Sequence, residues 1–563
     1  MNAPRMTSFH ASLQSSRTCL LRITAAIAAS LVLTNPCLYA AAAPPDAGQT
    51  LQQLQPQPAW PPDAATLELQ APAAPESAAG GAQLTLTRIN LSSTAFPAEQ
   101  LLDLVKDAYG QRLDLAGLNA LAARITNFYR AHGYPFAVTL VPPQTPHNGE
   151  ITLQIIEGRY GRVTASGDDA DEAAAWLTRL QPGAAITQGP LERSLRVLDR
   201  VPGVSISPVM QPGQEVGAGD LNVELRRKRV GGSVGMSNHG NRYTGEAQAR
   251  AGAWAGSVLT FADQVTLDAL LTDESLWMGA LNYEMPLGTS GLRTRFGYAH
   301  TYYELGEEFA DLDATGRARI ASAGLSHPLL LTVQGSVEVA LDYRHKSLRD
   351  SQGAVGAKTD KSSDSLRAAV SFDWRDRWLG GGVSWGTLAL THGRLSLDDA
   401  AEHIDAASAR TQGDFDSLTL DLSRVQSITG PFSLYGRLAA QWASKNLDSS
   451  ESFGLGGIYG VRAYPTGEGY GDEGVLMQLE ARYRVGSFTP YALYDAGRVQ
   501  IDAKRWSPGR NRRDLSGAGV GLRWNGMQVS ADVNVAWRTS GDAATASPRD
   551  RGRRIWAGLQ SRF

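Results

Sequence analysis

From about residue 229 to Phe563 the sequence alternates between apolar and polar residues with little interruption. In the run 527–537, for example, Met, Val, Ala, Val, Val and Trp alternate with Gln, Ser, Asp, Asn and Ala. A period of two places successive side chains on opposite faces of a β-strand, so each strand has one apolar and one polar face. The helical period is absent here, and the region is predicted to be all β.

Alternation alone fits a soluble β-sandwich, whose apolar faces meet inside, or a membrane β-barrel, whose apolar face contacts lipid. The segments are about 9–12 residues long, the length of a tilted membrane-crossing strand, whereas sandwich strands have about five or six residues. Ten of the twelve tryptophans lie between Trp254 and Trp556, often near segment ends, as in the aromatic girdles of barrels. We count sixteen segments, an even number, and predict a sixteen-stranded antiparallel transmembrane β-barrel over residues 229–563.

The N-terminal segment 1–43 has the pattern of a secretory signal peptide. Basic residues precede an apolar run at 23–33, and small residues suited to cleavage lie at 40–43. A membrane anchor is the less favoured alternative, because the run is short and rich in Ala. The two cysteines, Cys19 and Cys37, both lie in this segment. The mature chain therefore has no thiol for catalysis, metal binding or disulfides.

Two small modules are predicted between the signal peptide and the barrel. Residues 44–81 contain eight prolines and are predicted to be a linker, with a short helix near 46–54 for which disorder is the alternative. Residues 82–158 follow the order β-α-α-β-β, with the clearest helix at 115–131. Residues 159–228 repeat that order. A repeated small α+β module indicates an array and not one compact catalytic domain.

Charge and composition exclude several classes of function. The formal net charge of −3 gives no reason to expect nucleic acid as a partner. The nine histidines show no metal-ligand spacing, and the Gly-x-Gly runs precede no helix that could bind a nucleotide. We therefore expect no metal, no cofactor and no enzyme activity. Carboxylates recur evenly along the strands, which favours a charged lumen over a glycosidase pair. The basic run 226–229 is predicted to be a solvated linker, with membrane or client contact as the alternative.

One connection in the barrel is far too long to be a simple turn. Residues 446–474 combine many glycines with Ile, Val and Tyr. Glycine permits tight folding and close backbone approach, and the large apolar residues indicate an ordered loop folded into the lumen. A buried Arg462 would need a charged partner. The candidate is Asp495, because a carboxylate in the middle of a strand must face the lumen.

The loop pattern Phe-x-x-Gly-Gly…Val-Arg-x-Tyr and the later Asp-x-Gly strand resemble hallmark motifs of the BamA-like superfamily of outer-membrane transporters. The chain most resembles the two-partner secretion branch, the haemolysin secretion/activation (TpsB; ShlB/FhaC/HecB) family, over nearly all of the mature chain. In this sequence Ala463 replaces the Gly that usually follows the motif arginine, so close packing there is strained. The resemblance implies that 82–158 and 159–228 are POTRA modules and that Asp495 is the barrel-wall partner of the loop arginine. The residues that match the loop motif are Gly456, Gly457, Val461, Arg462 and Tyr464.

The resemblance also implies a function. POTRA modules in the periplasm would capture an unfolded haemolysin- or adhesin-like exoprotein by β-augmentation, and the exoprotein would cross the outer membrane through the barrel. The helix near 46–54 would plug the resting pore. The terminal Phe563 resembles the signal by which the barrel assembly machinery inserts such proteins, and membrane lipid and lipopolysaccharide would be further partners. Two alternatives from the same membrane are a BamA-like insertion factor and a diffusion porin; an exported β-sandwich hydrolase has no catalytic constellation to support it.

Overall fold

The computed structural model describes residues 44–54, 82–92, 95–547 and 552–563. The predicted signal peptide with both cysteines, and residues 55–81 of the predicted linker, lie outside these ranges. Within them, no helix combines the length and the apolarity that a membrane-spanning helix requires.

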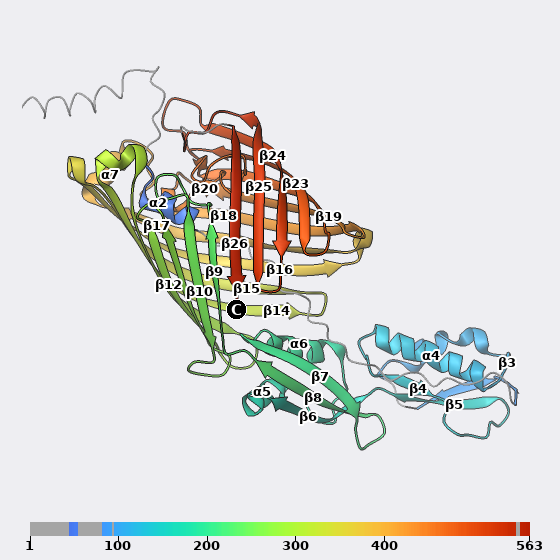
Figure 1. Cartoon of the computed structure of the whole chain (residues 1–563). Helices are drawn as coiled ribbons and strands as arrows, with labels where there is room; N and C mark the ends of the chain where they lie inside the picture. The colour runs from blue at the N-terminus through green and yellow to red at the C-terminus, as the bar shows by residue number, and fades with distance from the viewer. Residues whose placement is uncertain (1–43, 55–81, 93–94, 548–551) are drawn as a thin grey trace, which may run out of the picture. The chain divides into compact units, whose positions relative to one another are not determined.

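The first module packs helices against a small mixed sheet of order β2-β5-β4, in which β2 and β5 are parallel (Figure 1). Asp114 caps α4, since its carboxylate accepts a hydrogen bond of 2.9 Å from the backbone N–H of Gly117. Ile125 and Tyr129 of α4 are fully buried against Leu153 of β5. The predicted first strand is divided into two, and an additional short strand, β3, pairs with β1. The elements are β1 (Leu84–Thr85), β2 (Arg88–Leu91), α3 (Ala98–Asp103), the 3₁₀ turn η1 (Lys106–Ala108), β3 (Arg112–Leu113), α4 (Leu115–Ala131), β4 (Val138–Leu140) and β5 (Glu150–Ile156).

The second module repeats this architecture. Its sheet has the order β6-β8-β7, again with one parallel and one antiparallel pair. Leu195 and Leu198 of α6 are fully buried against Leu221 and Val223 of β8. The elements are β6 (Arg159–Gly167), α5 (Ala170–Leu177), α6 (Gln188–Asp199), β7 (Val204–Pro212) and β8 (Ala218–Arg227).

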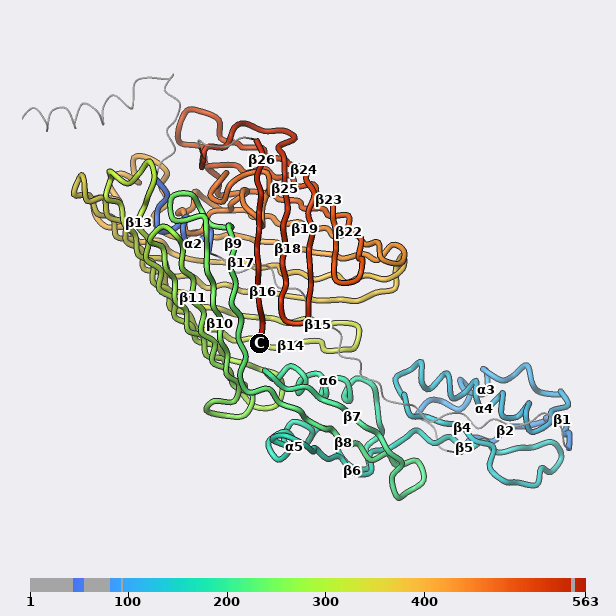
Figure 2. The backbone as a smooth tube through the Cα atoms, viewed as in Figure 1, coloured from blue at the N-terminus to red at the C-terminus, as the bar shows by residue number. Residues whose placement is uncertain are grey.

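The C-terminal region forms a closed barrel of sixteen antiparallel strands, which confirms the predicted fold (Figures 1 and 2). The last strand, β26, closes the barrel by pairing with the first, β9, from Gly558–Ser237 to Arg562–Ser233. The strands are β9 (Val230–Ser237), β10 (Gln248–Gly256), β11 (Gln264–Thr272), β12 (Trp277–Pro286), β13 (Arg293–Glu304), β14 (Ala314–Leu331), β15 (Gly335–Gln352), β16 (Ala357–Asp376), β17 (Gly382–Leu397), β18 (Gly413–Thr429), β19 (Phe432–Ala443), β22 (Glu473–Tyr483), β23 (Phe488–Gln500), β24 (Arg512–Asn525), β25 (Val529–Gly541) and β26 (Arg553–Arg562).

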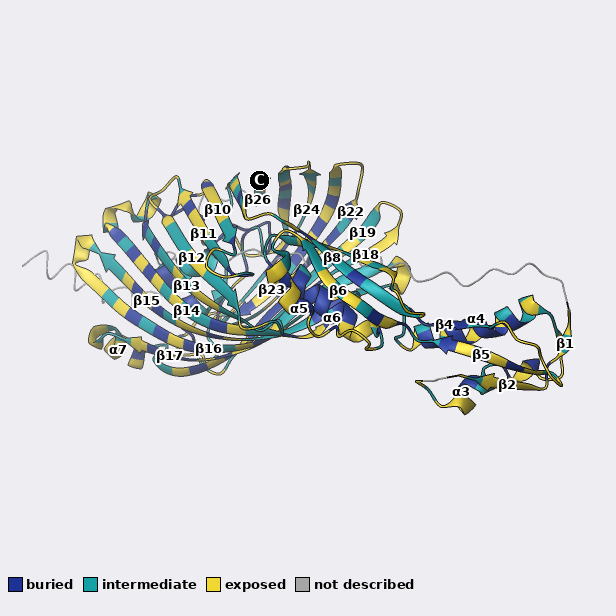
Figure 3. Cartoon of the chain, turned by 90° about the horizontal axis from the view of Figure 1, so that it is seen from below, coloured by how far each residue is buried: buried dark blue, intermediate teal, exposed yellow. Residues whose placement is uncertain are grey.

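The two faces of the barrel wall differ as the alternation predicts (Figure 3). On β15, Leu341 and Tyr343 point outward and are exposed, whereas Asp342 between them points inward and is buried. The outward face is therefore apolar over the width of a bilayer, as in membrane barrels.

The structure differs from the prediction in strand length and in one helix. Strands β14 to β18 are 18, 18, 20, 16 and 17 residues long, well beyond a membrane crossing. Their ends away from the modules carry charged pairs such as Arg349–Asp360. Between β17 and β18, helix α7 (Asp399–Ala406) forms where we expected no helix, because the Asp398 carboxylate caps it through the Ala401 N–H at 2.9 Å.

The basic run that joins the second module to the barrel is exposed at Arg226, Lys228 and Arg229, as predicted for a solvated linker, but the Arg227 side chain is buried. The side chain of Arg227 is only 3% exposed and forms an ion pair with Asp169, at the start of α5. Arg227 also donates a hydrogen bond of 2.9 Å to the Gly256 carbonyl at the end of β10. Arg229 adds a second ion pair with Asp169, at 3.0 Å. A carboxylate of the module therefore holds the start of the barrel.

Candidate functional site

The loop of residues 446–474, hereafter the lumen loop, folds into the barrel. A short hairpin of β20 (Phe453–Gly454) and β21 (Tyr470–Gly471) closes it. The apolar residues at its tip are fully buried and pack on inward-facing residues of β22 and β24, including Leu476 and Leu515. These tip residues are Leu455, Val461, Ala463 and Tyr464.

Arg462 lies at the centre of the lumen loop and contacts two buried carboxylates. It forms a bidentate pair with Asp495 of β23, with Nε–Oδ2 and Nη2–Oδ1 distances of 2.8 and 2.7 Å. The Arg462 backbone N–H donates to the same carboxylate at 3.0 Å. The guanidinium Nη1 donates to Glu480 of β22 at 2.5 Å. This hydrogen bonding offsets much of the desolvation cost of burying these charges.

Glu480 links Arg462 to the barrel wall and was not predicted from the sequence. Its second carboxylate oxygen accepts from Arg482 at 2.6 Å and lies 3.6 Å from Arg523. Arg523 in turn pairs with Asp532 at 3.1 Å. Glu480 alternates with apolar residues in its strand, so the same rule that selected Asp495 also places it inward. No signal in the sequence ranks Asp495 above Glu480 as the partner of Arg462.

The other motif residues shape the loop. Gly457 has a φ of +104°, which a residue with a side chain rarely adopts, and a Cβ on Gly456 would overlap the Pro465 carbonyl. The Val461 N–H donates to the Leu455 carbonyl at 2.7 Å. The Tyr464 hydroxyl hydrogen-bonds to the backbone carbonyls of residues 540 and 542, at the end of β25 and just beyond it, at 3.2 and 3.1 Å.

The alanine that replaces the motif glycine packs against a glycine of the barrel wall. Ala463 is fully buried, and its methyl faces Gly517 of β24. A Cβ on Gly517 would overlap that methyl. The missing side chain at 517 therefore accommodates the additional methyl at 463.

A second acidic residue fixes the returning arm of the lumen loop. Glu468 is fully buried and forms an ion pair with Arg513 of β24. Its other oxygen accepts from the backbone N–H groups of Thr545 and Ala546 at 2.8 and 2.9 Å. Sequence reasoning missed this residue because its partners lie 45 to 78 residues further along the chain.

Helix α2 (Ala47–Gln53) also lies inside the barrel, against β14, β15 and the 3₁₀ turn η5 (Ser449–Glu451) of the lumen loop (Figure 2). Its cap residue Asp46 accepts from Lys361 of β16 at 2.8 Å and from the Ser449 hydroxyl at 2.6 Å. Lys361 also contacts Asp448 of the lumen loop at 2.7 Å. One lysine of the wall thus holds both the helix and the loop.

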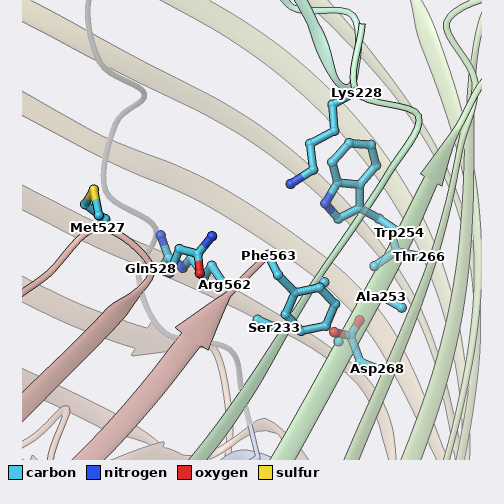
Figure 4. A pocket seen from close by; sticks show the side chains of 12 residues that line it. Lys228, Ser233, Ala253, Trp254, Thr266, Asp268, Met527, Gln528, Arg562 and Phe563 are labelled. Carbon is cyan, nitrogen blue, oxygen red and sulfur yellow. The ribbon is translucent and has the colours of Figure 1, made fainter.

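The two ends of the barrel chain meet at the terminal phenylalanine. The Phe563 N–H donates to the Gly232 carbonyl at 3.0 Å, and its carbonyl accepts from the Gly232 N–H at 2.9 Å. Phe563 lines a cavity of about 540 Å³ beside Trp254 and Arg562 (Figure 4). The structure does not bring Phe563 near the lumen-loop residues. Among the described residues, no group of His, Cys, Asp or Glu could hold a metal ion.

Comparison with known protein families shows which family has this architecture. The family model described as haemolysin secretion/activation protein ShlB/FhaC/HecB matches residues 217–524. The chain belongs to this family. A ShlB-type POTRA domain matches residues 84–158, within the first module. ShlB/FhaC/HecB proteins are two-partner secretion transporters, and this chain is such a transporter in the bacterial outer membrane, with its POTRA region in the periplasm.

Curated relatives cover most of the chain. The heme/hemopexin transporter HuxB of Haemophilus influenzae is 26% identical over 462 residues, covering 78% of this chain and 81% of the relative. The outer membrane transporter CdiB of Dickeya dadantii is 22% identical over 493 residues, covering 84% and 86%. The solved structure of CdiB from Escherichia coli has the same fold, with a TM-score of 0.68 at 19% identity, and covers 87% of this chain and 92% of that one.

Proposed function

We propose that this ShlB/FhaC/HecB-type transporter receives an unfolded haemolysin- or adhesin-like exoprotein at its two periplasmic modules and passes it through the lumen once α2 has left. The names of HuxB, a heme/hemopexin transporter, and of the Proteus mirabilis hemolysin transporter HpmB support an exoprotein of this kind. No catalytic chemistry is part of this proposal. The exposed edges of the module sheets are the places where an extended client segment can add as a further strand.

The observation that carries the proposal is the way in which the lumen is filled. Helix α2 has only seven residues, and it is attached by the ionic and polar contacts of its cap residue Asp46 together with an apolar contact of Ala47, Leu51 and Leu54. The lumen loop instead buries a continuous apolar surface and two ion-paired carboxylates. We therefore assign α2 the role of a removable plug and the lumen loop that of a resident element. An occupied lumen supports this assignment over an open diffusion porin.

The chain length between α2 and the first module is compatible with such a movement. Residues 55–81 connect the two and contain six prolines. A proline-rich segment of this length can span about 80 Å. The helix can thus leave the lumen without detaching from the chain.

A reversible crosslink tests the proposal. The cap residue Asp46 of α2 accepts a hydrogen bond of 2.6 Å from the Ser449 hydroxyl, so these two side chains face each other. In D46C/S449C an oxidised pair locks α2 in the lumen, and the natural cysteines lie in the predicted signal peptide, away from the pair. We expect oxidised cells to stop releasing the co-encoded exoprotein into the medium, and reduction to restore release.

Matched controls separate locking from damage. The single variants D46C and S449C, each oxidised and reduced, report the effect of the substitutions alone. Undiminished release by a fully crosslinked double variant would contradict a plug that must leave. Insertion of other barrel proteins, measured in the same cells, distinguishes a BamA-like activity.

The remaining partners follow from the sequence. Phe563 is proposed to be read by the barrel assembly machinery, and its exposed ring at the barrel seam is compatible with recognition there. Membrane lipid is proposed to cover the outward apolar face of the barrel wall.

A further inference from the structure

A basic patch lies on the outward face of β13, β14 and β15, at the end of the barrel away from the modules. It consists of Arg317 and Arg319 of β14, Arg349 of β15, and His300 and Tyr302 of β13, hereafter the cationic patch. The strand register places Tyr302 opposite Arg317 and His300 opposite Arg319. Arg317 lies opposite Arg349 on its other side. These five side chains are therefore immediate neighbours.

The position of the cationic patch along the strand is that of the outer lipid headgroups. Arg317 and Arg319 are exposed, whereas Ala318 between them is buried against the lumen side. Leu325 lies on the same face of β14, six residues after Arg319, and its side chain faces lipid and is 45% exposed. At the opposite end of β14 the Pro328 carbonyl contacts the second module, which marks the periplasmic side. The arginines thus lie above the apolar belt, on the extracellular side.

The protein neutralises one of the three arginines of the patch and leaves the other two without an acidic partner among the described residues. Arg349 pairs with Asp360, at 2.5 and 3.1 Å. Within the described ranges, neither Arg317 nor Arg319 has a carboxylate at ion-pair distance; the Arg317 guanidinium lies over the Tyr302 ring, 5.7 Å from its centroid. Like charges directly opposite each other in a sheet, as Arg317 and Arg349 are, destabilise it. The sheet therefore gains stability when an anion binds between them.

Two other outward basic residues near this rim are paired with carboxylates. Arg394 of β17 lies 3.2 Å from Asp414, and His392 lies 2.8 Å from Asp416. These pairs occupy the same outward face but leave no excess charge. The cationic patch is thus distinct from the paired rim of β17 and β18.

An apolar and aromatic surface lies next to the cationic patch. Trp277 of β12 stacks on His300, with ring centroids 5.0 Å apart and an interplanar angle of 6°. Tyr298 and Phe296, the next outward residues of β13 toward the membrane centre, are about half exposed. A ligand that matches this surface has an anionic group joined to acyl chains.

We propose that the cationic patch binds a phosphate group of the phosphorylated glycolipid of the outer leaflet, lipopolysaccharide, through Arg317 and Arg319. The guanidinium fork matches phosphate oxygens, and the acyl chains would lie on Tyr298 and Phe296. This site faces lipid and is separate from the lumen, so it is independent of the proposed transport route.

Binding of lipid A to the purified full-length protein tests the proposal. Native mass spectrometry in detergent counts bound bisphosphorylated lipid A molecules on wild type and on R317Q/R319Q. We expect the affinity of the double variant for lipid A to fall by about tenfold or more, because the variant loses two charged contacts. R394Q makes the same chemical change at a neutralised arginine and should bind as wild type does. The single variant R319Q, which keeps Arg317 on Tyr302, should lose an intermediate amount.

Several outcomes would overturn the proposal. One is equal lipid A binding by wild type and R317Q/R319Q, both shown to be folded by heat-dependent gel mobility. Another is equal loss in R394Q, which would indicate only the general charge of the rim. Displacement of lipid A by inorganic phosphate alone would assign the patch to a free anion. Equal retention of phosphatidylethanolamine would assign it to lipid in general.

Discussion

Arg462 contacts two carboxylates, Asp495 and Glu480. Asp495 pairs with Arg462 alone, whereas Glu480 contacts three arginines. Asp495 accepts both of its side-chain ion contacts and a backbone N–H from Arg462 alone. Glu480 is divided among Arg462, Arg482 and Arg523. The two acids therefore contribute differently to the position of the lumen loop.

Replacement of these acids separates their roles. We expect D495N to destabilise the folded barrel by about 3–5 kcal/mol, because it leaves the buried Arg462 without its bidentate partner. The measurement is the temperature at which the folded barrel, which migrates faster on a gel than the unfolded chain, is lost on heating. We expect this temperature to be lower for D495N. E480Q retains one acid for Arg462, so we expect a smaller decrease. The same unfolding temperature for D495N and wild type would contradict the assignment.

The pair Ala463–Gly517 gives a second prediction at this scale. We expect G517A to destabilise the protein by about 1–3 kcal/mol, since its new methyl overlaps that of Ala463. A463G should be nearly neutral alone and should rescue G517A. The measurement is a double-mutant cycle of unfolding temperatures. Additive effects of the two substitutions would show that the methyl groups do not compete.

Which of these residues the sequence could predict depends on the physical signal. A charged residue in the middle of an alternating strand must face the lumen, which is why Asp495 could be selected. Glu480 carries the same signal, but only the folded loop shows that both acids reach Arg462. Glu468 has no such signal, because it lies in an irregular segment and its partners are distant in sequence.

At the scale of elements, the apolar alternation predicts strands only where lipid contacts them. It therefore identifies all sixteen barrel strands but not the extensions of β15 to β18, where the outward residues are polar and the alternation ends. Helix α7 was missed because it lies in such an extension and is too short to show a helical period. Helix 115–131 was predicted to its ends, since its cap and its apolar stripe are both local signals.

Helix α2 is the element whose displacement should change the pore. The close approach of Gly48 to Ser449 and to the Ser450 backbone leaves no room for a side chain. We expect G48V to push α2 from its position and to raise the single-channel conductance in planar lipid bilayers. Q49A changes a neighbouring, partly exposed residue of the same helix and should leave conductance unchanged. Equal conductance of G48V and wild type would show that α2 does not limit the pore.

At the scale of the whole molecule, specific hydrogen bonds and ion pairs join the second module to the barrel. Arg193 of α6 donates to the carbonyls of Pro328 and Leu329, at 3.0 and 3.3 Å. Glu192 accepts from the Val333 N–H at 2.9 Å. Asp169 pairs with Arg227 and Arg229 in the connecting run. The sequence showed the basic run but not its acidic partner, which lies almost sixty residues earlier.

This junction can be probed with trypsin, which cleaves after Arg and Lys. D169N removes the charge that holds Arg227 and Arg229, yet Asn tolerates the left-handed backbone of this position, where φ is +52°. We expect cleavage in the run 226–229 to become faster, because this segment must open before the protease can bind it. The fragment pattern on gels measures the rate.

A matched substitution on the same module distinguishes the junction from general loosening. Asp220 pairs with Arg162 at 2.7 Å on the module surface, away from the barrel. D220N removes an equivalent charge from a surface pair, which contributes about 1 kcal/mol or less, and should leave cleavage in the run unchanged. If D169N and D220N are cleaved at the wild-type rate, Asp169 does not hold the junction, and Arg193 and Glu192 must suffice to keep the module on the barrel.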